Sequence, residues 1–324
     1  MESVRRLAFS AVAGLLLCLG AITACAAPFP EKPVRVVVPW PPGGPSDTLA
    51  RLVMGKVGET LGQTMVIDNR AGASAVIGTE FAAKAAPDGY TLLWVIANHT
   101  TNHLLFKVTY DPVRDFTPVG QVARSSYLLL VHPDVPAKSL KEFVEYVKAR
   151  PGKLAYASAG NGTLQHLGME MLKREAGLDM VHVPYKGSAP AITDVLGGQI
   201  PATLEASTSV LPHVRAGRMR AIAVATQKRL PQLPDVPTVA ESGYPGFEVV
   251  GFTGLLAPAG TPVSAVSTLN SALSKALESS EVRERMATLG LEPAWSSPQQ
   301  FSAFLQAEIP KYSKILKESG AKLD

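Results

Sequence analysis

Short apolar runs alternate with amphipathic stretches along most of the chain. The first run, 34–38, is β-branched and is followed by a loop rich in proline and glycine. After this loop, Ser46 or Asp47 can cap a helix that ends near Gly62. The helix is predicted by apolar residues at helical spacing, namely Leu49, Leu52, Val53, Val57 and Leu61.

The same alternation continues and predicts an α/β fold, with a parallel sheet and helices on both faces. Further strands are expected at 64–68, 90–96, 154–158, 180–185, 219–225 and 247–257. Further helices are expected at 73–86, 163–175, 189–196, 210–215, 263–277, 282–289 and from Ser297 onward, with Pro310 kinking the last one. Ser139 and Glu142 form a capping box before another helix.

Two extended segments divide the chain. Residues 115–133 and 247–257 are long enough to cross between domains, so we expect the chain to leave the first domain, build the second and return. The predicted division is 27–124 plus 250–324 for the first domain and 125–249 for the second. The proline-rich region 231–245 is expected to be a loop or linker.

The N-terminus resembles an export signal. Arg5 and Arg6 precede an apolar run at 7–22 that is short for a membrane span, and small residues follow. Two interpretations of the cleavage site stay open: ordinary cleavage within 24–26, which the further small residues favour, or a lipoprotein box that lipidates Cys25. With 1–26 as a signal peptide, the protein is expected in the periplasm, and the mature chain has no pair of cysteines for a disulfide.

The charge balance gives no indication of a nucleic-acid partner. The chain carries 31 Lys and Arg against 27 Asp and Glu, a formal charge of +4 that becomes +3 without residues 1–26. These charges are scattered rather than clustered, so nucleic acid is excluded as a partner, whereas a small anionic ligand is compatible.

Two strand–loop–helix units predict anion sites, because a helix N-terminus directs free backbone N–H groups to one point. One is the loop that includes Trp40, Pro42, Gly43 and Asp47, and the other is the glycine loop 158–163. Asn98 follows the third strand at its carboxyl end, where open α/β sheets bind ligands. Trp40 and Phe252 can be core aromatics or walls of a ligand site.

Motifs for catalysis and cofactors are incomplete. The glycine loop begins a dinucleotide-binding fingerprint but has Gln165 at its third position, so no cofactor is expected. His99 and His103 have the spacing of metal ligands, but no neighbouring acid or cysteine completes a set, and no metal is expected. Ser158 and His166 suggest an exported hydrolase as an alternative function, although no nucleophile elbow surrounds the serine.

Ordered blocks along the mature sequence resemble the Bug, or TctC-type, family of extracytoplasmic solute receptors. They lie at 36–44 with Asp47, 68–70, 86–92, 158–163 with His166, 183–187, 196–199, 233–238 and 254–258. The resemblance implies a two-domain, Venus-flytrap periplasmic-binding-protein fold with the ligand in the cleft. It also implies that the glycine loop binds a carboxylate through N–H and hydroxyl groups, and that the loop from Trp40 to Asp47 acts partly through waters.

The sequence therefore predicts a binding protein and not an enzyme. A di- or tricarboxylate, an aromatic acid or an amino acid would be captured by a monomer and delivered to the membrane components of a tripartite tricarboxylate transporter. A lipoprotein receptor with a signalling role is a second alternative. One wall departs from the family, because Glu205 replaces an aspartate. The predicted ligand-binding residues are Trp40, Pro42, Gly43, Asp47, Asn98, Ser158, Gly160, Asn161, Gly162, Thr163, His166 and Glu205.

Overall fold

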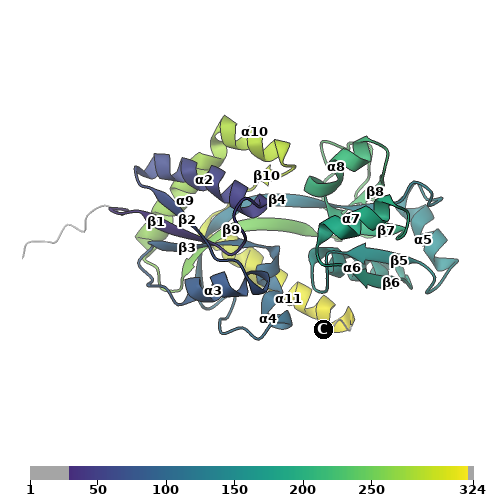
Figure 1. Cartoon of the computed structure of the whole chain (residues 1–324), viewed down its shortest axis with the longest axis horizontal. Coiled ribbons are helices and arrows are strands. Elements are labelled where there is room, and N and C mark those ends of the chain that lie inside the picture. The colour runs from purple at the N-terminus through teal and green to yellow at the C-terminus, as the bar shows by residue number, and fades with distance from the viewer. Residues whose placement is uncertain (1–28, 320–324) are drawn as a thin grey trace, which may run out of the picture.

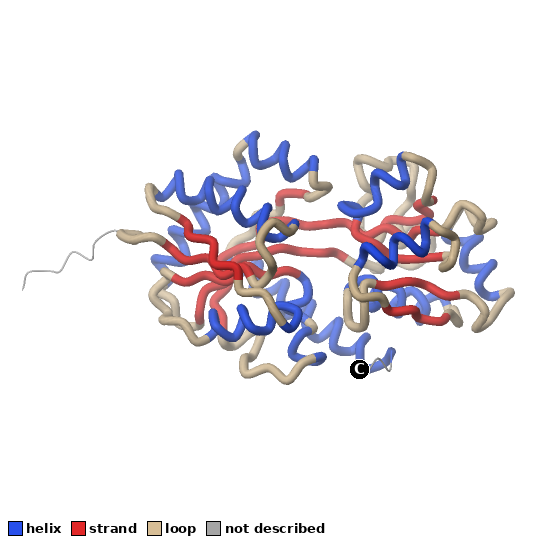
Figure 2. Tube along the Cα trace, viewed as in Figure 1, coloured by secondary structure: helices blue, strands red, loops and turns tan. Residues whose placement is uncertain are grey.

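The computed structural model describes residues 29–319 and shows two α/β lobes side by side (Figure 1). Two long strands, β4 (Phe116–Val131) and β9 (Val250–Pro258), run between the lobes, as the tube in Figure 2 shows in red. The predicted signal peptide and both cysteines lie outside the described residues. Within 29–319, no helix has the length and apolarity needed to cross a membrane.

The first lobe contains the strand order β2-β1-β3-β9-β4. The first three strands are parallel, whereas β9 is antiparallel to both β3 and β4. The sheet is therefore mixed, and of these five strands only β9, one of the two that cross between the lobes, runs antiparallel to the others. The elements of this lobe are β1 (Val34–Val38), α2 (Pro45–Leu61), β2 (Met65–Asn69), α3 (Val76–Ala83), β3 (Thr91–Ile96), α4 (Asn102–Leu105), α9 (Val263–Glu278), α10 (Ser280–Thr288) and β10 (Glu292–Pro293).

The second lobe continues the same sheet as β4-β7-β5-β6, with β8 on β4. Its parallel strands β5, β6 and β7 end on the side that faces the first lobe, which places the loops after them at the lobe boundary. Its elements are α5 (Leu140–Lys148), β5 (Ala155–Ser158), α6 (Leu164–Ala176), β6 (Val181–Pro184), α7 (Ser188–Leu196), β7 (Ala202–Ala206), α8 (Ser207–Arg215) and β8 (Arg220–Val224).

The crossing strands are paired with each other at the lobe boundary, where Ser125 lies opposite Gly251 and Ser126 opposite Val250. An added Cβ on Gly251 would lie 2.1 Å from the Ser125 hydroxyl, so the two strands approach closely there. The predicted domain boundaries, after residues 124 and 249, fall at this place, and a rotation of the lobes about it stays a prediction.

The last helix, α11 (Pro298–Ser319), continues through Pro310 and contacts both lobes. Phe301 and Leu305 pack in a core of the first lobe. Tyr312 and Ile315 instead belong to the main core of the second lobe, and Arg174 of α6 forms an ion pair with Glu318. The second half of α11 thus packs on the second lobe, and the predicted division of the chain into domains stays a prediction.

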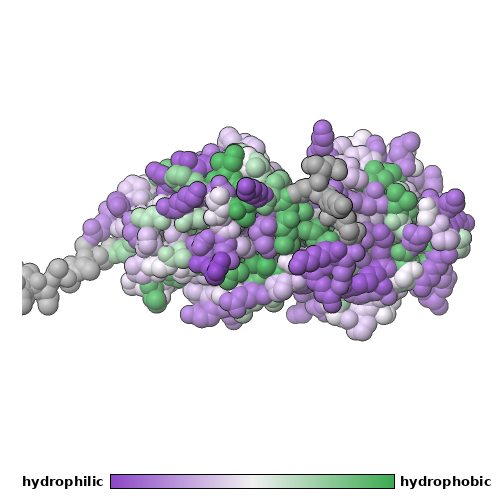
Figure 3. Space-filling model, turned by 90° about the horizontal axis from the view of Figure 1, so that it is seen from below, coloured by the Kyte–Doolittle hydropathy of each residue, from purple (hydrophilic) through white to green (hydrophobic). Residues whose placement is uncertain are grey.

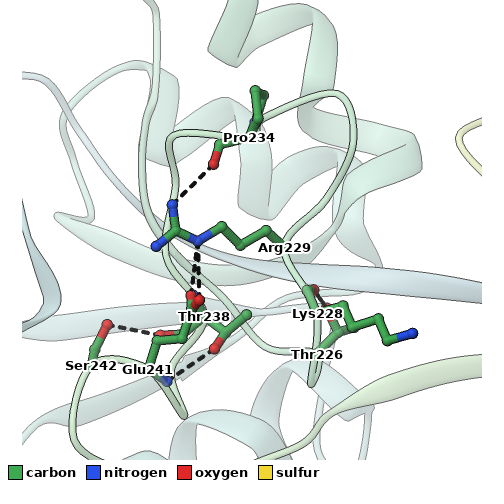
Figure 4. Close-up of polar contacts among 7 residues, drawn as sticks. All are labelled: Thr226, Lys228, Arg229, Pro234, Thr238, Glu241 and Ser242. Atoms are coloured by element: carbon green, nitrogen blue, oxygen red, sulfur yellow. Dashed lines mark hydrogen bonds and ion pairs between the residues drawn. The ribbon is translucent and has the colours of Figure 1, made fainter.

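The proline-rich segment 231–245 is an ordered loop that belongs to the second lobe (Figure 4). Arg229 donates to the Glu241 carboxylate at 2.9 Å and to the Pro234 carbonyl at 3.1 Å. Thr238 and Glu241 exchange backbone-to-side-chain hydrogen bonds, as a capping box does. Because the Val239 N–H also donates to the carbonyl of Val224 in β8, the segment is fixed to the sheet and is not a linker.

Candidate ligand-binding cleft

Two adjoining cavities lie between the lobes and share Ile96, Ala97 and Tyr127. We call the first the glycine-loop cavity, with a volume of about 410 Å³ and walls that include residues 159 and 161–165. The second, the hinge cavity, has a volume of about 400 Å³ and is lined by Ser46, Thr208, Gly251 and others. Viewed from below, both lobes are largely hydrophilic outside, and hydrophobic surface shows where they meet (Figure 3).

Hydrogen bonds within the glycine loop after β5 fix its conformation beside the cavity. Gly160 and Gly162 have φ values of 128° and 72°, which favour glycine. The Gly160 N–H donates to the Ser158 hydroxyl at 3.1 Å, and the Thr163 hydroxyl donates to the Gly160 carbonyl at 2.7 Å. Of this loop, Ala159, Asn161, Gly162 and Thr163 line the cavity, whereas Ser158 and Gly160 do not, and the ligand-binding role of the loop stays a prediction.

Two helix N-termini meet at the glycine-loop cavity. α6 begins after Thr163, whose side chain makes no capping bond, and α7 begins after Gly187, which has no side chain to cap the helix. The first N–H groups of a helix have no partner within the helix, and the helix dipole adds positive potential there. Thr163, Gln165, Gly187 and Ser188 all line the cavity, so this end of it favours an anion.

The opposite wall comes from the first lobe and includes Trp40 and Asn98. Asn98 and Asn102 each donate an amide N–H to the carbonyl of Ser74 at 2.7 Å. The Trp40 indole N–H is buried and has no hydrogen-bond partner among the described residues. A buried donor without a partner is costly, so an acceptor that reached this N–H would stabilise the protein.

Most of the loop between Trp40 and α2, which is expected to bind the ligand, lies away from the two cavities. Pro42 and Gly43 are exposed and line neither cavity. The expected cap on Ser46 or Asp47 is wrong, because the N-cap is Gly44, without a side-chain bond. Asp47 is 2% exposed and accepts from the Gly43 N–H at 2.8 Å. It also accepts from Arg51 and Asn69 at 2.9 Å, so its carboxylate fixes the loop rather than facing the cavity.

Ser158 and His166 do not form the pair that a hydrolase would need. Ser158 is fully buried, and its hydroxyl bonds to Nε2 of His182 at 2.6 Å. His166 stacks on His182 with ring centroids 4.0 Å apart, and its Nδ1 accepts from the Gly162 N–H at 3.1 Å. Both residues therefore hold the glycine loop by hydrogen bonds on the side away from the cavity.

The two histidines make this support sensitive to acid. Burial, helped by His166 and Lys173, lowers the pKa of His182 to about 3, and burial also lowers the pKa of His166. The unfolded chain, with histidines near pH 6.5, binds more protons than the native state in acid. Stability from these rings is therefore complete above pH 6.5 and is lost as pH falls toward 3.

We expect the wild type to lose more unfolding free energy than His182→Gln when pH falls from 7 to 5. Urea denaturation at the two pH values measures the difference. Burial raises the pKa of Glu205 to about 7, which acts in the opposite direction between pH 7 and 4.5, and this contribution cancels between the two proteins. An equal loss in both would contradict the prediction.

Glu205 is the fourth of the five residues of β7 and is fully buried beneath the cavity wall. Its Oε2 accepts from Gln165 and Ser188, both at 3.2 Å, and these two residues line the cavity. Its Oε1 has no partner among the described residues. Sequence reasoning did not select Gln165 or Ser188, although each lies in the first turn of a helix that follows a glycine.

The metal-like spacing of His99 and His103 has a structural explanation. His99 is 3% exposed, and its Nε2 lies 2.9 Å from the carbonyl oxygen of Pro112. Burial lowers its pKa to about 4. In the described part of the chain, no three His, Cys, Asp or Glu residues are placed to hold a metal ion.

Comparisons with known proteins agree on the class of protein. Residues 49–321 match the model of the family described as "Tripartite tricarboxylate transporter family receptor". Protein BugT of Bordetella pertussis is 37% identical over 318 residues, which are 97% of this chain and 98% of BugT.

Solved structures with carboxylates are similar over nearly the whole chain. A protein of R. palustris solved with adipate is 37% identical, has a TM-score of 0.77 and is matched over 91% of this chain and 100% of its own. MatC from Rhodopseudomonas palustris with bound malate is 37% identical, has a TM-score of 0.73 and is matched over 89% and 100%.

Proposed function

Since this chain belongs to the family of tripartite tricarboxylate transporter receptors, we propose that it captures a small carboxylate in the glycine-loop cavity and delivers it to the membrane components of such a transporter. The class is that of a periplasmic solute-binding protein and not of an enzyme. The ligand is a dicarboxylate or tricarboxylate, an aromatic acid or an amino acid, bound by a monomer.

The observation that carries the proposal is the meeting of two uncapped helix N-termini, those of α6 and α7, at one cavity. No lysine or arginine is among the described residues that line it, so the anion would be held by backbone N–H groups, hydroxyls and amides. Neutral donors directed at one point stabilise a carboxylate without a counter-charge. The cavity of about 410 Å³ has the size of a site for a small molecule.

Both lobes supply walls, so binding would draw them together. Leu105 of the first lobe already lies against Gly162 of the second, where an added Cβ would be 2.2 Å from the leucine Cδ1. A ligand held by Trp40 and Asn98 on one side and by the glycine loop on the other favours this closed arrangement. The strands at Ser125 and Val250 would act as the hinge.

We expect a carboxylic acid, and not a neutral sugar or a metal ion, to raise the melting temperature of the purified protein. A ligand at 100 times its dissociation constant adds about 2.7 kcal/mol of stability, which a thermal-shift assay detects readily. Titration calorimetry of the acids that respond gives their affinities. The proposal fails if sugars or metals shift the transition and no acid does.

Delivery is a separate step with its own test. Cells that carry the transporter should take up the labelled acid more slowly when this receptor is deleted, and the chain should restore uptake. Binding without any change in uptake would instead favour the signalling alternative.

A further inference from the structure

Glu205 lies where the N-termini of three helices of the second lobe come together. Its Oε2 accepts from Gln165 of α6, from Ser188 of α7 and from the Ala206 N–H at the start of α8, each at 3.2 Å. The carboxyl group thus occupies a position that attracts anions, but it is enclosed by protein and fully buried. It can influence a solute only through the residues that cover it.

Those covering residues have their hydrogen-bond donors turned away from the cavity. Nε2 of Gln165 donates both to Ser188 Oγ, at 3.0 Å, and to Glu205 Oε2. This uses both hydrogens of the amide. The hydroxyl of Ser188 donates its one hydrogen to the same carboxyl oxygen. What Gln165 retains is its amide oxygen, which can only accept.

We propose that Glu205 is a positioning residue that fixes the Gln165 amide with its oxygen available to the solute. The site then selects carboxylic acids that carry a hydroxyl or ammonium donor next to the bound carboxylate. This inference rests on the proposed function and adds to it a preference among acids. The carboxylate lies on the helix N-termini, and the adjacent donor meets the amide oxygen.

The protonation of Glu205 gives the preference a pH dependence. Burial raises the pKa of Glu205 to about 7, while hydrogen bonds from Gln165, Ser188 and Ala206 oppose the rise. Ionised Glu205 can only accept hydrogen bonds, so it keeps the NH₂ group of Gln165 turned toward itself. The protonated carboxyl can donate to the Gln165 amide oxygen, so the amide can then turn and its oxygen no longer faces the solute. The titratable neighbour is Tyr127 of β4, and burial raises its pKa further from neutrality. The preference for donor-bearing acids should therefore grow from pH 6 to pH 8.

The test uses acids that differ only in the donor group. The four-carbon set is succinate, malate and aspartate, the three-carbon set is propionate, lactate and alanine, and the aromatic set is 3-phenylpropionate, phenyllactate and phenylalanine. Calorimetry at pH 6 and pH 8 measures each affinity. For the skeleton that binds, the wild type should prefer a donor-bearing acid by about tenfold at pH 8, the value of one hydrogen bond, and by less at pH 6.

Two variants separate positioning from a general structural effect. Glu205→Gln places an amide NH₂ against Gln165, which can then turn, so the preference should fall below about threefold and lose its pH dependence. Glu170→Gln removes a charge from α6 in the same lobe, at a residue that accepts from Tyr156 and Lys173 and does not line the cavity. It should keep the preference of the wild type.

The outcomes are distinct. If no acid of any set binds the wild type, the proposed function fails and this inference with it. If acids bind without a preference, or if Glu205→Gln weakens all of them equally, only this inference is overturned. Tighter binding of the unsubstituted acid at pH 6, lost in Glu205→Gln, would show that protonated Glu205 donates instead, and would also overturn it.

Discussion

Replacing Gly162 with alanine is expected to weaken carboxylate binding by about 100-fold. The residue has a φ of 72°, and a side chain there costs about 1–2 kcal/mol. The added Cβ would also lie 2.2 Å from Cδ1 of Leu105 in the opposite lobe. The loop must move to relieve the backbone strain and the clash with Leu105, and it then loses hydrogen bonds to the ligand. Each lost hydrogen bond to a charged ligand costs about 1.5–3 kcal/mol. Calorimetry with the acid that binds the wild type measures the loss.

Two further variants identify the cause. Gly55→Ala lies inside α2 with no atom within 4 Å of the new Cβ, so it should leave binding unchanged and stabilise the helix by about 1 kcal/mol. Adding Leu105→Ala to Gly162→Ala removes the contact between lobes but not the backbone strain, so it should restore part of the affinity. Affinity of Gly162→Ala equal to that of the wild type would refute the ligand-binding role of the loop.

Replacing Asp47 with alanine is expected to lower the free energy of unfolding by about 2–4 kcal/mol. The change removes the acceptor of three hydrogen bonds, which come from the exposed Gly43 N–H, from Arg51 and from the Asn69 amide; the amide keeps its bond to the Trp40 carbonyl. A hydrogen bond to a charged group contributes about 1.5–3 kcal/mol, and water replaces part of this contribution at the exposed Gly43 and Arg51. Urea denaturation at pH 7 gives the value.

Asp47→Asn is the matched control, because it keeps one acceptor oxygen and the side-chain shape. Burial raises the pKa of Asp47, but the hydrogen bonds from Arg51, Gly43 and Asn69 together outweigh burial and lower it. A lowered pKa contributes stability that is present above the unfolded value of 3.8 and lost as pH falls below it. The asparagine variant should lack this acid-dependent loss, and a loss equal to that of the wild type would contradict the assignment.

Local signals predicted most of the elements. The run 34–38 forms β1, and Gly62 ends α2 in a left-handed conformation, as the sequence indicates. Strand β7 was missed because two of its five residues, Thr203 and Glu205, are polar, yet both are buried. Thr203 is satisfied by the carbonyl of Ala157, 46 residues away, and no local pattern reveals such a partner.

The site was predicted less completely than the fold, for the same reason. The glycine loop is recognisable because its residues are consecutive. The ring that holds Ser158 is His182, which comes from the neighbouring strand through the parallel pairing of β5 with β6. Ser74 lines the cavity from a segment with a φ of 51°, and nothing in its local sequence specifies that conformation.

Helix α11 has a consequence for how solute reaches the cleft. It is anchored in a core of each lobe and runs below the crossing strands (Figure 1). Because α11 links the two lobes on one side of the molecule, we expect the cleft to open on the opposite side. The distance between two spin labels placed on either lobe at that side should change strongly on opening. The distance between two labels placed beside Arg174 and Glu318 should hardly change.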